Sequence, residues 1–315
     1  CWWTIPTDSI GIHKEITMTT PVAQSTAQST AKTIVQIKSA PPQHWVGNGF
    51  KVHGMFNYND NAALFSPFLL MDYGAPTQFA PNMGQPNGVG SHPHRGFETV
   101  TIAYAGEVTH RDSAGGGGTI AAGDVQWMTA GAGIVHNEFH SPAFSQRGGM
   151  MHMVQLWVNL PAKDKMTPAH YQAISKAQIA QVDSDAGSVR LIAGDLDEHK
   201  GAAETYTPMR LWDLRVKAGQ SMTLPQPDGW TTLLLVQSGT VKVNGSNTVG
   251  AAQLVVLSRK GSDVSISASS DAQMLLLAGE PINEPVVGYG PFVMNTKAEI
   301  QQAFFDFDSG KFGEI

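Results

Sequence analysis

The chain has 315 residues, 42% of them hydrophobic and only 15% charged, so it is long enough to bury one large core or two ordinary ones. A formal charge of -6 argues against direct binding to nucleic acid, and the single cysteine excludes intrachain disulfides and cysteine-based zinc sites. No apolar run approaches the roughly 20 residues that span a bilayer. We therefore expect a cytoplasmic monomer that binds neither membranes nor nucleic acid.

The first part of the chain is expected to be a flexible lead-in. Residues 18–33 are rich in Ser, Thr, Ala and Gln and show no apolar period. The sequence Met18-Thr19-Thr20 resembles a natural start, so we interpret residues 1–17 as a segment upstream of it. The lead-in is expected to end at residue 33.

From residue 34 the sequence changes to short apolar stretches that are typical of β-strands. Strands are expected at 34–37, 50–53, 65–71, 99–104 and 154–158, with turns rich in Gly and Pro between them. Many short strands at such spacing favour a sandwich or a barrel. We predict an N-terminal β-barrel over residues 34–160.

A second β-rich block follows a connecting segment, residues 161–205, in which a short helix and a strand at 189–194 are expected. In this block, residues 206–315, strands are expected at 211–216, 231–237, 240–243, 253–258 and 274–278, and an amphipathic helix at 296–305. Residues 239–245 are similar to the neighbourhood of 104–108, which indicates a duplicated barrel. The predicted fold is all-β, with two antiparallel β-barrels, a few short helices and a C-terminal helix.

Two short motifs point to chemistry. His92-Pro93-His94 and His136-Asn137-Glu138 each place two side chains at i and i+2, which share one face of a β-strand. Two such strands facing each other inside a barrel would bring three imidazoles and one carboxylate together. This set suits Fe(II), Mn, Ni, Cu or Zn, and it leaves positions on a six-coordinate ion for other molecules. All eleven histidines lie at or before His199, so only the first barrel can hold such a site.

Other side chains compete for these roles. His140 extends the second motif and is an alternative ligand or a hydrogen-bond donor behind one. Glu98 is an alternative ligand, or a base beside the metal. His110 is assigned to a turn with a structural hydrogen-bonding role, and His53 and His152 are candidates to line the cavity. The competing interpretation, ordinary core histidines, is disfavoured because two such motifs occur together.

Longer stretches around the two motifs add specificity. Residues 92–100, 123–131, 133–136, 155–161 and 290–296 together resemble the signature of the pirin family, which belongs to the cupin superfamily. The resemblance covers residues 33–315. It implies two β-barrel domains, of which only the first binds a metal ion.

The resemblance also implies the identity of the ligands. It assigns iron, with Fe(II) as the leading candidate, to His92, His94, His136 and Glu138. Glu98 fits the spacing of the general cupin ligand glutamate, but in pirins the carboxylate ligand comes from the second motif. Glu138 therefore ranks above Glu98.

Two classes of function follow from the resemblance. The first is an enzyme of the quercetin 2,3-dioxygenase type, which cleaves a flavonol with dioxygen, and there Glu138, or with less support Glu98, would take the substrate proton. The second is a non-enzymatic, redox-sensitive iron protein that regulates a transcription factor or a metabolic enzyme, with a protein as its partner. We favour the enzyme, because open metal positions in an apolar barrel are chemically competent. Ala132 and Asn137 stand where pirins commonly have Arg and Ser, which puts the substrate's identity in question.

Overall fold

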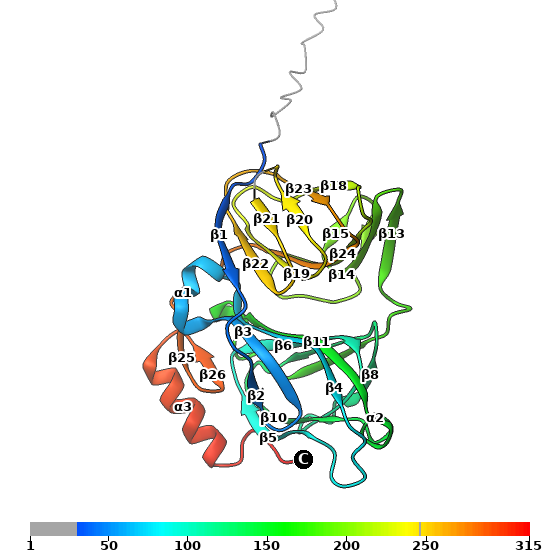
Figure 1. Cartoon of the computed structure of the whole chain (residues 1–315). Coiled ribbons are helices and arrows are strands. Elements are labelled where there is room, and N and C mark those ends of the chain that lie inside the picture. Colours follow the sequence, from blue (N-terminus) through cyan, green and yellow to red (C-terminus); the bar gives the residue numbers. More distant parts are fainter. Residues whose placement is uncertain (1–29, 246) are drawn as a thin grey trace, which may run out of the picture.

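The computed structural model describes residues 30–315 except residue 246, and it consists mainly of antiparallel strands (Figure 1). The strands form two units, each built from a seven-stranded and a four-stranded sheet. The predicted all-β fold with two cupin-type units is confirmed, but each unit is a sandwich of two sheets and not a closed barrel. Of the predicted lead-in, only residues 30–33 are among the described residues.

The first unit carries both histidine motifs. Its seven-stranded sheet has the order β12 (His170–Ile174), β9 (Val125–Thr129), β6 (Phe97–Ala105), β11 (Gly149–Asn159), β4 (Phe68–Phe79), β3 (Phe50–Asn57) and β2 (His44–Val46). Its four-stranded sheet has the order β5 (Gly88–His94), β10 (Ile134–His140), β7 (Glu107–Asp112) and β8 (Gly117–Ala121). The motifs lie on β5 and β10.

The second unit repeats this arrangement. Its seven-stranded sheet has the order β1 (Ile34–Ser39), β22 (Gln253–Leu257), β19 (Thr231–Ser238), β24 (Ala272–Gly279), β17 (Met209–Val216), β14 (Gly187–Ala193) and β13 (Ala180–Ser184). Its four-stranded sheet has the order β18 (Ser221–Pro225), β23 (Asp263–Ala268), β20 (Val241–Val243) and β21 (Asn247–Val249). The space between these two sheets is filled by Leu, Val and Ile side chains.

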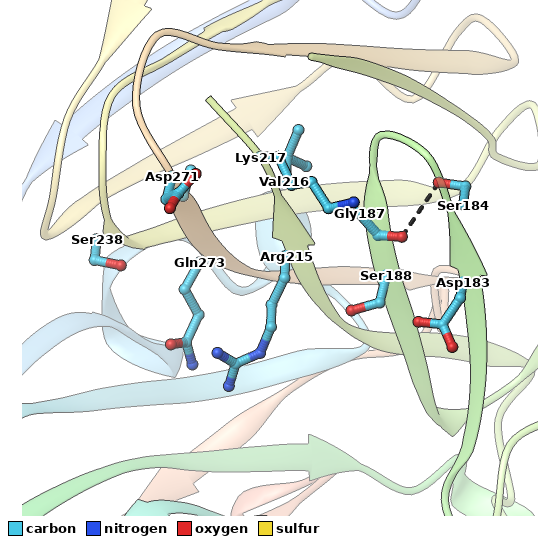
Figure 2. Close-up of a pocket in the computed structure, with 11 residues that line it drawn as sticks. Asp183, Ser184, Gly187, Ser188, Arg215, Val216, Lys217, Ser238, Asp271 and Gln273 are labelled. Atoms are coloured by element: carbon cyan, nitrogen blue, oxygen red, sulfur yellow. Dashed lines mark hydrogen bonds between the residues drawn. The ribbon is translucent and has the colours of Figure 1, made fainter. Parts of the chain in front are cut away.

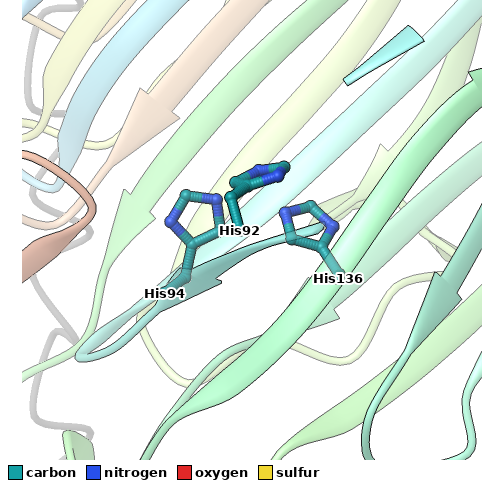
Figure 3. Close-up of side chains that lie close together, drawn as sticks. All are labelled: His92, His94 and His136. Atoms are coloured by element: carbon teal, nitrogen blue, oxygen red, sulfur yellow. The ribbon is translucent and has the colours of Figure 1, made fainter. Parts of the chain in front are cut away.

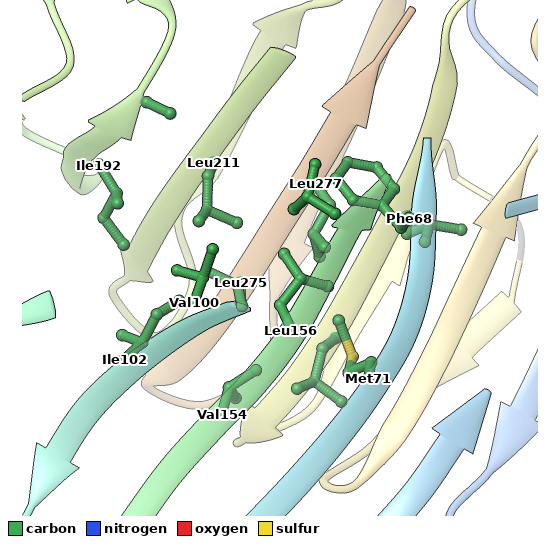
Figure 4. Packing of buried hydrophobic residues seen from close by; sticks show 14 of the residues in the cluster. Phe68, Met71, Val100, Ile102, Val154, Leu156, Ile192, Leu211, Leu275 and Leu277 are labelled. Carbon is green, nitrogen blue, oxygen red and sulfur yellow. The ribbon is translucent and has the colours of Figure 1, made fainter. Parts of the chain in front are cut away.

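The two seven-stranded sheets pack against each other and form the core between the units (Figure 4). Strand β19 shows how the sequence specifies this packing. Leu233 and Leu235 lie in the core between the units, whereas Leu234 and Val236 lie in the second unit's own core. Because successive side chains of a strand alternate between its faces, a strand buried on both faces needs an unbroken apolar run.

The chain crosses between the units at places that the sequence did not indicate. Strand β1 was expected to begin the first barrel, but it pairs with β22 of the second unit. The predicted connecting segment contributes β12 to the first unit and β13 and β14 to the second. Apolar alternation identifies a strand, but it does not identify the strand's partner, so these assignments required the structure.

The C-terminal segment also lies against the first unit and not, as expected, with the second. It comprises β25 (Val287–Tyr289), β26 (Phe292–Met294) and α3 (Lys297–Asp308). Helix α3 begins at a capping box formed by Thr296 and Glu299, and it packs Ile300 and Ala303 in a cluster with Val135 of β10. This contact covers the strand that carries the second motif.

Short elements complete the fold. They are α1 (Tyr58–Phe65), α2 (Pro142–Arg147), a 3-10 turn at Ala162–Asp164, and the two-residue strands β15 (Asp195–Leu196) and β16 (His199–Lys200). Within residues 30–315, none of the helices has the length and apolar character needed to cross a membrane.

Candidate metal centre

The two histidine motifs lie side by side in the four-stranded sheet of the first unit. Strands β5 and β10 pair antiparallel, with His92 opposite His136 and His94 opposite Ile134. We expected the motif strands to face each other across a barrel, but they are neighbours in one sheet. The three imidazoles meet because the register of this strand pair brings them to one face (Figure 3).

The rings of His92, His94 and His136 form a compact cluster. Their centroids are 4.2 Å apart for His92 and His136, 4.8 Å for His92 and His94, and 4.9 Å for His94 and His136. Burial, together with the neighbouring His92, lowers the pKa of His94 to about 3, and burial beside other histidines holds the pKa of His136 well below its usual range. The rings of His94 and His136 are therefore neutral at pH 7, and each has a lone pair to offer a cation.

In two of these rings, Nδ1 forms a hydrogen bond with a backbone carbonyl group. Nδ1 of His92 donates to the carbonyl oxygen of Gly90 (2.8 Å), and Nδ1 of His94 donates to that of Pro291 (3.2 Å). Metal-binding histidines usually donate their second nitrogen to such an acceptor, which sets the tautomer and the ring orientation. In both rings Nε2 is left as the ligand atom.

The third ring has a different partner. Nδ1 of His136 lies 3.3 Å from Nδ1 of His110, and Nε2 of His110 lies 2.9 Å from Oδ2 of Asp112. His110 is on β7, not in the turn that we predicted, but it does make hydrogen bonds as expected. His110, His136 and Glu138 also bring ligand atoms within 4.8 Å of one another. Because both nitrogens of His110 are engaged within the protein, the cluster of His92, His94 and His136 is the better metal site.

Nε2 of His136 supports this assignment. It is buried and has no hydrogen-bond partner among the described residues. A buried polar atom without a partner costs free energy that a ligand would recover. Together with the two other free nitrogens, it fits a divalent transition-metal ion, for which imidazole is a preferred ligand.

Glu138 is buried at the edge of this cluster. Its Oε1 accepts hydrogen bonds from Nε2 of Gln126 and from Oγ1 of Thr101 (3.2 Å). Both donors belong to the seven-stranded sheet, so Glu138 bridges the two sheets. Its side chain also lines the cavity that the three histidines border. Glu138 is therefore placed where it can serve either as a ligand or as a base.

Glu98, the other predicted carboxylate, lies on the opposite face of its sheet. Its neighbours on that face are Val100 and Trp127, which belong to the core between the units, and its Oε1 accepts a hydrogen bond from Oγ1 of Thr129 (2.7 Å). Burial raises the pKa of Glu98 to about 7. Glu98 does not border the cavity, so its position does not suit a base at this site.

The other candidate histidines also lie outside the cavity. Nε2 of His140 donates to the carbonyl oxygen of Gly49 (2.8 Å), and its ring packs edge-on against Phe79. His53 and His152 pack against the ring of Tyr73, on the side of the sheet that faces the second unit. None of the three is among the residues that line the cavity.

The cavity between the two sheets has a volume of about 200 Å³. Most of its wall is apolar, and the wall includes Phe50, Val52, Met153 and Trp157. Sequence reasoning missed one of its polar residues, Asp72 on β4. The signal was weak, because Asp72 directly follows an apolar run and its face is apparent only once the strand's register is known.

A larger hollow of about 510 Å³ lies in the second unit (Figure 2). Its lining mixes two basic and two acidic side chains, Arg215, Lys217, Asp183 and Asp271. It contains no histidine, and within the described residues no group of metal-ligating side chains borders it. The candidate functional site is therefore the smaller cavity beside the histidine cluster, although the hollow in the second unit has the larger volume.

A two-unit cupin fold with a histidine cluster in its first unit defines a class of protein. The fold and the cluster are those of a bicupin whose first unit carries a metal-type site. Two family models match the chain, "Pirin" over residues 49–158 and "Pirin C-terminal cupin domain" over residues 211–313. The chain belongs to the pirin family, which confirms the predicted resemblance.

Individual relatives agree with this assignment. A Pseudomonas aeruginosa protein named "Putative quercetin 2,3-dioxygenase" is 49% identical over 283 residues, which are 89% of this chain and 98% of that protein. A tomato (Solanum lycopersicum) "Pirin-like protein" is 42% identical over 250 residues, which are 78% of this chain and 82% of that protein.

The fold also matches a solved structure. The crystal structure of a quercetin 2,3-dioxygenase from Acinetobacter baumannii superposes with a TM-score of 0.88 at 53% identity, and covers 91% of this chain and 100% of that one. An Escherichia coli pirin solved with nickel(II) has a TM-score of 0.58 at 21% identity, which shows similarity of fold alone.

Proposed function

We propose that this pirin is a metal-dependent dioxygenase of the quercetin 2,3-dioxygenase type, with a flavonol and dioxygen as substrates. The observation that carries the proposal is the buried Nε2 of His136, which has no partner among the described residues and borders a cavity that two further imidazoles and the carboxylate of Glu138 also line. The names of relatives at 49% and 53% identity support the same reaction.

In this proposal the ion is held by His92, His94, His136 and Glu138. Fe(II) is our leading candidate, and Mn, Ni, Cu and Zn suit the same donors. The bound ion would supply Lewis acidity and a template for the two substrates. The donor set resembles the imidazole and carboxylate sets of mononuclear iron sites.

The protein's own groups have three tasks in the reaction. The apolar wall excludes water and packs against the aromatic rings of the substrate. Gln126 and Thr101 orient the carboxylate of Glu138 through Oε1, which leaves Oε2 to contact the ion or the substrate. We propose Glu138 as the group that takes the proton of the substrate's enolic hydroxyl, because it borders the cavity and Glu98 does not. A carboxylate bound to a cation is a weak base, so this role requires Glu138 to loosen from the ion.

The test is dioxygen uptake with quercetin by protein loaded with Fe(II). We expect uptake by the wild-type chain, none above background by His92→Ala, and normal uptake by His199→Ala, which removes an exposed histidine of the second unit. Absence of uptake by the loaded wild-type chain across a panel of flavonols would contradict the proposal and favour the regulatory function.

A further inference from the structure

The floor of the cavity carries a row of polar side chains across four neighbouring strands. Asp72 of β4 lies opposite Gln155 of β11, Gln155 lies opposite Thr101 of β6, and Thr101 lies opposite Gln126 of β9. Oγ1 of Thr101 contacts Oε1 of Gln155 (2.8 Å), and Nε2 of Gln126 donates to Oγ1 of Thr101 (3.0 Å). The row therefore begins beneath Glu138 and ends at Asp72.

Asp72 differs from the rest of this row because its carboxylate has no hydrogen-bond donor among the described residues. It is half-buried in the cavity wall, and this burial raises its pKa to about 6 although His44 acts in the opposite direction. A carboxylate that is partly desolvated gains free energy from a hydrogen-bond donor. Its oxygens are therefore available to accept a hydrogen bond from a molecule in the cavity.

The neighbour on β3 places no side chain beside this carboxylate, although the ring of His44 stands nearby. Gly54 lies opposite Asp72, and a Cβ atom at Gly54 would stand 3.5 Å from Oδ1 of Asp72 and 3.4 Å from Cε1 of His44. Because Gly54 has no side chain, it leaves the carboxylate of Asp72 uncovered on this side.

The distance between Asp72 and Thr101, the residue beneath Glu138, suits an aromatic molecule. Neighbouring strands are about 4.8 Å apart, so Asp72 lies roughly 10 Å from Thr101, which contacts Glu138. The wall beside this path includes Trp157 and Phe50. The cavity's 200 Å³ is below the roughly 300 Å³ of sites that enclose a drug-sized ligand, so it has room for part of a three-ring molecule.

We propose that Asp72 is a specificity-determining residue that accepts a hydrogen bond from a phenolic hydroxyl on the substrate ring that enters the cavity. The inference rests on the proposed function, because it assumes an aromatic substrate whose hydroxyketone end lies at the histidine cluster. If Asp72 has this role, the protein should bind flavonols with hydroxyl groups on their outer rings more tightly than flavonols that lack them.

The experiment measures equilibrium binding to metal-loaded protein without dioxygen, so that turnover is not needed. The probes are quercetin, whose outer rings carry hydroxyls, and 3-hydroxyflavone, whose outer rings carry none. We expect the wild-type chain to bind quercetin roughly tenfold more tightly, as one hydrogen bond to a charged group predicts. Asp72→Leu should lose this preference while its affinity for 3-hydroxyflavone stays unchanged. Asp72→Asn, whose amide oxygen still accepts a hydrogen bond, should retain part of it.

Each result separates this inference from the proposed function. A preference that depends on Asp72 without dioxygen uptake supports the binding role and contradicts the enzyme. Uptake with equal affinities for both probes, or an Asp72→Leu variant that weakens both equally, overturns the role of Asp72 and leaves the enzyme standing. Metal content and thermal unfolding of each variant show whether a loss arises from misfolding, and a preference that survives in a folded Asp72→Leu variant also overturns the inference.

Discussion

Nδ1 of His136 lies 3.3 Å from Nδ1 of His110, and two ring nitrogens at this distance need one hydrogen between them. Asp112, which lies two residues after His110 in the chain, sets the direction of that hydrogen bond. Oδ1 of Asp112 accepts the backbone N–H groups of Ala114 (2.9 Å) and Gly116 (2.8 Å), and Oδ2 accepts from Nε2 of His110. His110 then has its hydrogen on Nε2 and accepts at Nδ1, so His136 donates from Nδ1 and keeps Nε2 free for an ion.

This chain of hydrogen bonds predicts the effect of Asp112→Asn. The two backbone donors need an oxygen at Oδ1, so the variant's NH₂ group would face Nε2 of His110. That ring would have to accept there and donate from Nδ1, which moves the hydrogen of His136 to Nε2 and blocks the ligand atom. We expect metal affinity to fall roughly 10- to 100-fold, measured by competition with a chelator.

Asp124→Asn is the matched control for this variant. Asp124 also accepts backbone N–H groups in a turn, those of Ala121 and Lys176, but it lies away from the histidines. Its replacement should leave metal affinity unchanged. An Asp112→Asn variant that binds metal as tightly as the wild-type chain would show that the tautomer of His136 is not fixed in this way.

Replacing each of the two buried carboxylates near the motifs should affect catalysis differently. Glu138→Gln removes the proposed proton acceptor from the cavity, and we expect kcat for quercetin cleavage to fall by about 100-fold or more. Glu98→Gln changes a group on the other face of β6, so activity should persist. Steady-state kinetics on protein with verified metal content measures both. Full activity of Glu138→Gln would eliminate it as the base.

Glu98 also predicts a pH dependence of stability. Its pKa is raised from 4.5 to about 7 by burial, so the folded chain holds this proton more tightly than the unfolded chain does. The stabilisation is fully present below pH 4.5 and is lost as the pH rises to about 7. Glu98→Gln removes this loss, so at pH 8 the variant should be more stable than the wild-type chain by roughly 3 kcal/mol.

Denaturant unfolding at pH 4 and at pH 8 checks this expectation. The difference between the two chains isolates Glu98 from other titrating groups. A difference in unfolding free energy that is the same at both pH values would mean that the carboxyl group does not titrate in this window.

An ion pair between the C-terminal segment and the residue after His94 is expected to support the metal centre. Arg95 directly follows His94, and its guanidinium group contacts Asp306 of α3 (2.9 Å) with both side chains buried. The carbonyl of Pro291 also holds the ring of His94. We expect Asp306→Asn to lower metal affinity about tenfold, because the support behind a ligand is loosened.

Asp308→Asn changes an exposed carboxylate on the same helix and should bind metal normally. Calorimetric titration with the metal alone compares the two variants. Equal affinities would show that α3 does not influence the site.

Much of this site could be predicted from sequence because its motifs are local. An i, i+2 pair on a strand shares a face whatever the strand's neighbours are. Glu98 shows the limit of that reasoning. Gly96, at a φ of +87°, turns the chain between β5 and β6, so the alternation that holds for His92 and His94 does not continue into the next sheet. Contacts over long separations, such as Pro291 with His94, leave no local pattern.

Anaerobic titration with Fe(II) tests the assignment of a metal ion to His92, His94 and His136. This assignment predicts saturation at a single ion per wild-type chain, and loss of that binding in His136→Ala while its thermal unfolding remains cooperative. A His136→Ala variant that binds Fe(II) with wild-type affinity and stoichiometry would contradict it.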